Sequence, residues 1–131
     1  MRRAAAAVVA ALALAACSED EGSADELCKA VAESEVTAVF QGFDPTDRDS
    51  ALDQLRTARV TLGDLHDAAP GEVRDDVQVE IAYVQALIDA LEAVEPGDAT
   101  EATLQIQAVT DAHPGIDEAA ANLTAFAEEE C

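Results

Sequence analysis

Hydrophobic residues recur every three or four positions along most of the sequence after residue 23, which is the spacing of one face of an α-helix. The most regular run has apolar residues at successive spacings of four, four, three, four and three: Val73, Val77, Ile81, Val84, Ile88 and Leu91. No alternation of apolar and polar residues is long enough to predict a β-strand, and no internal repeat is present. The pattern therefore predicts an all-α fold.

Capping and helix-breaking residues divide this region into five predicted helices. Their expected ranges are 24–41, 47–69, 72–94, 99–112 and 116–130. Ser23 and Glu26 form a predicted capping box at the first start, and Asp47 or Thr46 caps the second helix. The side chains expected in the core of the second, fourth and fifth helices are Leu52, Leu55, Leu62, Leu104, Ile106, Val109, Ile116, Ala119, Ala120, Leu123 and Phe126.

The first 16 residues follow a different pattern, that of a secretory signal peptide. Arg2 and Arg3 precede the uncharged run 4–16, and acidic residues begin at Glu19. A membrane-spanning helix would need about 20 apolar residues, so the run is too short for one. We expect residues 1–16 to be removed.

The end of this run, Leu14-Ala15-Ala16-Cys17, resembles the lipobox of bacterial lipoproteins. The resemblance implies cleavage before Cys17, a diacylglycerol on its sulfur, and a location on the extracytoplasmic face of the cell membrane. Two acyl chains on one residue would give stable anchoring. The alternative is an ordinary secreted protein with a leftover thiol. On the lipoprotein interpretation, 17–23 is the lipidated cysteine with an acidic leash, and 24–131 is a single helical domain.

Two further cysteines remain once Cys17 is assigned to the lipid. Cys28 and Cys131 are an even pair in an oxidising compartment, and we expect them to form a disulfide; the alternative is two unrelated thiols. The bond constrains the topology, because a simple five-helix zigzag would place these residues at opposite ends. We therefore expect an up-down bundle of four main helices, the first, second, third and fifth, with 99–112 crossing obliquely.

The formal net charge of −21 limits the possible partners. Removing residues 1–16 also removes Arg2 and Arg3, which leaves 28 acidic and 5 basic residues and a charge of −23. Such a surface repels nucleic acid and anionic lipid head groups. We expect no nucleic-acid partner, and we expect the lipid on Cys17 to hold the protein at the membrane.

Motifs for catalysis or metal binding are absent from the sequence. It has no Gly-x-Ser-x-Gly elbow, and its histidines, His66 and His113, have no partner at metal-binding spacing. Four aspartates gather between the first two predicted helices, but they do not match an EF-hand loop: Asp44, Asp47, Asp49 and Asp53. We expect no catalytic residue, no metal site and no cofactor.

A wider resemblance rests on Leu52-x-x-Leu55-Arg56 and on segment 69–77, Ala-Pro-x-Glu-Val-x-Asp-Asp-Val. With a cysteine near the first helix start and another at residue 131, the chain resembles small helical lipoproteins common in actinobacteria, a family without an assigned activity. The resemblance implies a fold and a location and carries no mechanism.

Two functional hypotheses follow, neither of them enzymatic. The first is a lipid-anchored interaction module that presents an acidic face to an envelope protein, and its sign would be an exposed apolar patch. The alternative is a lipoprotein that binds a small ligand or a cation such as calcium among its acidic residues. Its sign would be thermal stabilisation by the ligand.

Overall fold

The computed structural model describes residues 21–34 and 43–131. In these residues the chain forms five α-helices and no strand: α1 (Ala24–Glu33), α3 (Arg48–Ala68), α4 (Gly71–Glu92), α5 (Ala99–Ala112) and α6 (Ile116–Glu130). The predicted all-α fold is confirmed.

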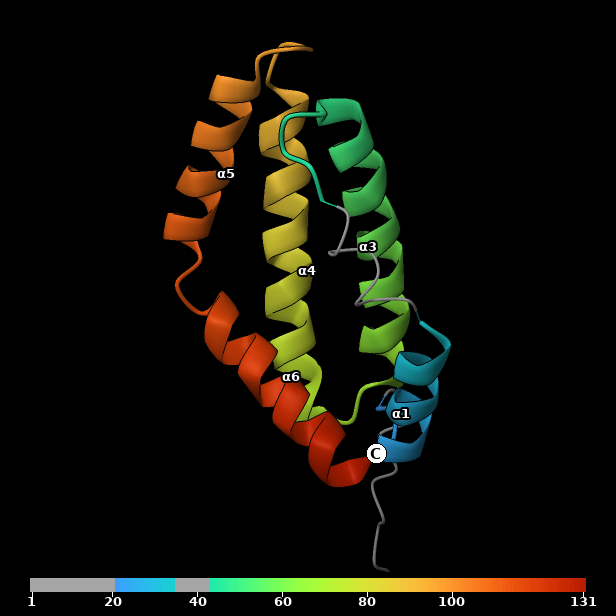
Figure 1. Ribbon diagram of the computed structural model, residues 1–131. Coiled ribbons are helices and arrows are strands. Elements are labelled where there is room, and N and C mark those ends of the chain that lie inside the picture. The colour runs from blue at the N-terminus through green and yellow to red at the C-terminus, as the bar shows by residue number, and fades with distance from the viewer. Residues whose placement is uncertain (1–20, 35–42) are drawn as a thin grey trace, which may run out of the picture.

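Four of the helices form a closed ring. α3 and α4 make an antiparallel pair, α6 packs on α4, and α1 joins α3 to α6 (Figure 1). Along the chain, α1, α3, α4 and α6 point alternately up and down in Figure 1. This is the predicted up-down arrangement of four main helices.

α5 lies outside the ring, along the C-terminal part of α4, and α6 continues beside the N-terminal part (Figure 1). Both helices run downward in that view, and α6 is the more inclined of the two. The chain therefore kinks at Pro114 without reversing. Tyr83 of α4 holds the end of α5 in place, because its hydroxyl lies 3.0 Å from Thr110 Oγ1 and its ring makes an edge contact with His113.

The core follows the predicted stripe of α4 closely. All six of its residues are buried, and Leu91 is completely inaccessible. The predicted core residues of α3 are also buried. Two predictions were wrong: Leu104 of α5 is 59% exposed, and Ala120 of α6 is exposed. α5 packs mainly on α4, so a single narrow side of it is covered, and Ala102 is its one buried residue.

The first helix ends earlier than the predicted residue 41. α1 stops at Glu33, and Ser34 has an extended backbone. The Ser34 hydroxyl donates to the Val31 carbonyl at 3.0 Å, a local bond of the kind that competes with helix continuation. The rest of the predicted range, 35–41, lies outside the described residues.

Side-chain caps mark three helix starts, among them those predicted at Ser23 and Asp47. Ser23 and Glu26 make both bonds of the capping box, at 3.2 and 3.1 Å. Asp47 accepts from the backbone N–H of Ser50, and Asp98 accepts from that of Glu101. Because these carboxylates bind the free N–H groups at helix N-termini, part of the negative charge is stabilising.

The two chain ends of the bundle meet at its lower end in Figure 1. Cys28 of α1 and Cys131 are joined by a disulfide with a Cα–Cα distance of 5.5 Å, as predicted. Gly22 donates to the Ala69 carbonyl at 3.2 Å, and a Cβ on Gly22 would collide with the backbone of Ala68. Residue 22, which the prediction placed in the leash, therefore packs against the helical domain.

Replacing both Cys28 and Cys131 by Ser should lower the free energy of unfolding by up to about 4.7 kcal/mol, because the bond closes a loop spanning 103 residues of sequence separation. Urea unfolding followed by circular dichroism measures the loss of unfolding free energy. Cys17→Ala is made in the parent and in the doubly substituted chain to remove the third thiol. Reduction of the parent chain is the matched control and should give the same value. A loss below about 1 kcal/mol would show that packing alone holds α6 against α1.

Candidate functional site

A cavity of about 230 Å³ lies where the four helices of the ring meet. Its inner end is formed by residues that are buried in the core: Leu27, Leu62, Leu65 and Val77. Val31, Ala120 and Thr124 also line it but are exposed, so they mark its mouth between α1 and α6. Every helix of the ring therefore contributes to one largely apolar space.

Glu80 of α4 is the only ionisable residue among the described residues that line this cavity. It follows Val77 by three positions, so it lies beside the buried stripe of the helix. Burial raises the pKa of Glu80, and the negative charge of Asp76, one turn away, raises it further. Asp76 itself accepts a 3.1 Å hydrogen bond from Asn122 of α6. The cavity thus combines apolar walls with one carboxyl group whose pKa is raised.

The four aspartates before and in the first turns of α3 each have a local partner. Asp44 accepts from the Thr46 N–H and hydroxyl, and these bonds lower the pKa of Asp44. Asp47 caps α3. Asp49 and Asp53 lie 3.0 and 3.6 Å from arginine nitrogens. In the described part of the chain, no group of three or more acidic, histidine or cysteine side chains is arranged to hold a metal ion.

Neither histidine lies in the cavity. His66 Nδ1 is 3.8 Å from an Asp67 oxygen on the outside of α3. His113 Nδ1 is 2.7 Å from the Val109 carbonyl oxygen, where the ring caps the end of α5. Both rings have structural neighbours.

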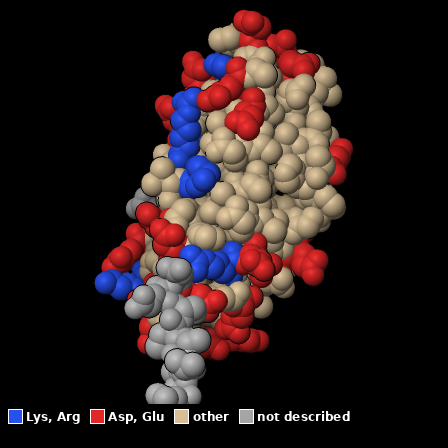
Figure 2. All heavy atoms as spheres, turned by 180° about the vertical axis from the view of Figure 1, so that it is seen from behind, with Lys and Arg blue, Asp and Glu red and all other residues tan. Residues whose placement is uncertain are grey.

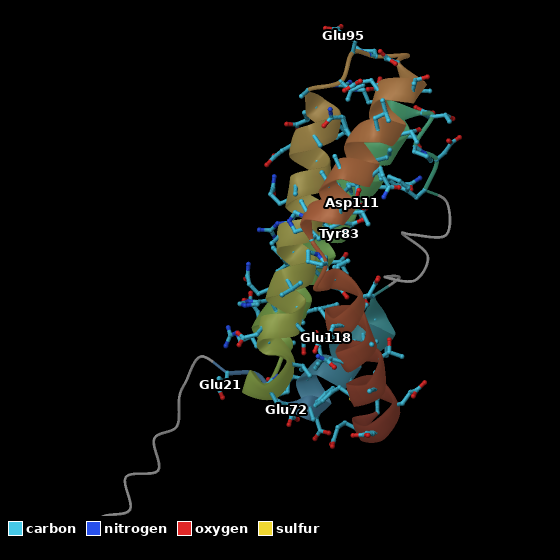
Figure 3. All side chains as sticks on the ribbon, turned by 90° about the vertical axis from the view of Figure 1, so that its left-hand side faces the viewer. Glu21, Glu72, Tyr83, Glu95, Asp111 and Glu118 are labelled. Atoms are coloured by element: carbon cyan, nitrogen blue, oxygen red, sulfur yellow. A yellow bond between two sulfur atoms is a disulfide. The ribbon has the colours of Figure 1, made fainter. Side chains whose placement is uncertain are left out.

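One side of the molecule has little charge. Figure 2, which views the molecule from behind, shows a broad surface without acidic side chains over α4 and α5. Between Asp76 and Asp89 the outward side of α4 consists of Gln78, Val79, Ala82, Gln85 and Ala86, and α5 has no charge from residue 102 to 110. We call this surface the α4–α5 uncharged face. The acidic residues labelled in Figure 3 include Glu95 at one end of the bundle and Glu21 and Glu72 at the other.

Two more hollows are shallow and open. One, of about 360 Å³, lies between the end of α1 and α3 and includes Glu33 and Asp64, whose side chains face solvent. The other, of about 370 Å³, lies between Thr46 and the first turns of α5. Neither hollow has walls of buried core residues around an ionisable group, as the cavity beside Glu80 does.

The structure tests the predicted site residues unevenly. It brings Cys28 and Cys131 together, whereas Cys17 lies outside the described residues. Sequence reasoning missed Glu80 and the uncharged face. Their common signal is that Glu80 is the only charged residue from 77 to 88, in a chain with 28 acids.

Comparison of the chain with protein-family models, with curated proteins and with solved structures gives no match. Among the described residues, none of the helices combines the length and the apolar character needed to cross a membrane. The functional argument therefore depends on the geometry of the fold.

Replacing Glu80 by Gln should raise the Tm at pH 7. The folded pKa of Glu80 is raised above its ordinary value of 4.5, so ionised Glu80 destabilises the fold above the folded pKa and has no such effect below 4.5. The difference in Tm should accordingly shrink as the pH falls toward 4.5 and vanish below it. Glu118→Gln on the exposed first turn of α6 is the control and should not raise the Tm. Equal effects of the two substitutions would assign the gain to net charge alone.

Proposed function

We propose that this protein is a lipid-anchored, non-enzymatic module that docks another protein of the cell envelope through the α4–α5 uncharged face. The observation that carries the proposal is the depletion of charge on one face of a strongly acidic protein (Figure 2). Protein interfaces are distinguished from other surfaces mainly by depletion of charged residues at their centre. The docking face is therefore uncharged, in contrast to the acidic face first expected.

The side chains of this face are small or polar and only partly buried, which distinguishes it from the core. Val79 is 37% exposed; Ala82 follows it one turn away on the same face and the half-buried Ala86 two turns away. Small side chains allow a partner backbone to approach closely, while Gln78 and Gln85 can form hydrogen bonds at the edge. Arg56 of α3 is engaged with Glu92 at 2.9 Å, so it borders the face as part of an ion pair.

The proposed anchor determines which surfaces a neighbour can reach. Cys17 precedes Gly22 by five residues, which span at most about 17 Å when fully extended. Gly22 is packed on the α3–α4 turn, so this end of the bundle would lie close to the membrane. α4 leads away from that turn, and the uncharged face would therefore be turned sideways, toward neighbouring proteins on the same membrane.

The anchor is tested by replacing Cys17 with Ala. Without the thiol no diacylglycerol can be attached, so the protein should leave the membrane fraction or remain unprocessed. Fractionation and intact mass measure this, with the parent chain expected to begin at Cys17 and to carry added lipid mass. Cys28→Ser is the control for loss of a thiol and should remain in the membrane. Membrane retention of the Cys17→Ala chain would contradict the anchor.

The docking face is tested by placing a photoreactive amino acid at Ala82 or, in a separate chain, at Ala86, and irradiating living cells. Both positions should crosslink to the same envelope protein, because they lie one turn apart on one face. A probe at Glu33 of α1 is the control and should not capture it. Ala82→Glu should reduce the yield from the probe at Ala86 at least about tenfold, since a buried unpaired charge is costly, whereas Ala82→Ser should not.

Equal capture from position 33, or an unchanged yield with Ala82→Glu, would contradict docking through this face. Crosslinking of the protein to itself would contradict an envelope partner and would identify the occupant of this face as a second copy of the same chain.

A further inference from the structure

The central cavity has the shape of a small binding site. Its inner end lies among core residues of three helices, including Leu27, Leu62 and Val77. Its mouth is formed by exposed residues of α1 and α6, and Thr124 places a hydroxyl there. A ligand could thus enter from solvent and reach apolar walls without unfolding a helix.

The volume limits the ligand to a small apolar group. An engineered apolar cavity of about 150 Å³ takes benzene, and this one is about 230 Å³. A ring or chain of roughly six to eight carbon atoms is the matching size. A complete lipid acyl chain is too long to be enclosed.

The negative charge of the site determines whether a bound ligand should be positively or negatively charged. Glu80 is the only ionisable lining residue among those described, and Asp76 adds a second negative charge one turn away on α4. α6 contains no basic residue, and Lys29 of α1 lies 3.9 Å from Glu33. A carboxylate ligand would meet repulsion here, whereas an ammonium group would find a carboxylate that lacks a basic neighbour in the cavity wall.

We propose that the cavity enclosed by α1, α3, α4 and α6 binds a small amphiphilic amine, with its apolar part against Leu27 and Leu62 and its ammonium group on the Glu80 carboxylate. The site is separate from the α4–α5 uncharged face and does not depend on the proposed docking function. The raised pKa of Glu80 supports it, because a bound cation would offset both causes of that shift.

The test uses hexylamine as the probe and the full-length chain with Cys17→Ala and the disulfide intact. Methyl NMR of the leucines follows the titration, and thermal unfolding gives a second readout by linkage. Hexylamine should shift the Leu27 and Leu62 methyl resonances and raise the Tm. Hexanol, hexanoate and methylamine are the matched probes, and each should bind at least about tenfold more weakly because it lacks either the charge or the apolar chain.

Two variants locate the site. Glu80→Gln keeps the shape and should weaken hexylamine binding at least about tenfold, to the level of hexanol. Ala120→Trp should obstruct the mouth and weaken both hexylamine and hexanol, whereas Ala121→Trp, at an exposed position that does not line the cavity, should leave them unchanged.

The proposal is overturned by hexylamine binding that survives Glu80→Gln, or by equal binding of hexanol. A methylamine effect equal to that of hexylamine would assign the stabilisation to general screening of the acidic surface and would likewise overturn it. Absence of any leucine methyl shift at saturating hexylamine would show that the cavity takes no such ligand.

Discussion

The fold depends on burial of the apolar stripe of α4. This helix contacts α3, α5 and α6, and its stripe is covered along its whole length. Each buried Leu, Ile or Val contributes about 1.5–3 kcal/mol, so the stripe is the largest single source of stability in a protein with few aromatic residues. The other helices are arranged by the need to cover it. α1 lies across the ring from α4 and is joined to α6 by the disulfide at Cys28.

A second constraint is the repulsion among 28 acidic residues. The structure moderates it locally, since Asp47 and Asp98 cap helices and Glu26 completes a capping box. α4 follows the same principle on a larger scale, because its acids gather toward its two ends and its outward middle is uncharged. The uncharged middle of α4 therefore reduces the repulsion within the fold, and it is also the surface through which we propose that the protein docks a partner.

The cavity and Glu80 lie on the side of α4 opposite to the uncharged face. Ala120 of α6 lines this region, and its small side chain leaves space that a larger one would fill. Glu80 then places a carboxyl group at the wall of that space, where burial and the charge of Asp76 raise its pKa. Titratable groups with perturbed pKa values in clefts are often found at functional sites. The proposed amine site rests on these two features together.

The sequence by itself determined the helices, most of their boundaries and the pairing of Cys28 with Cys131, because periodicity, caps and cysteine count are local or arithmetical properties. It could not show that α1 stops at Glu33, that Leu104 stays exposed, or that α5 and α6 share one side of α4, because these depend on which surfaces neighbouring helices cover. The cavity and the uncharged face are likewise products of the tertiary structure. Glu80 is the only charged residue from 77 to 88 in the sequence, but only the packing of the four helices places it in the wall of a cavity.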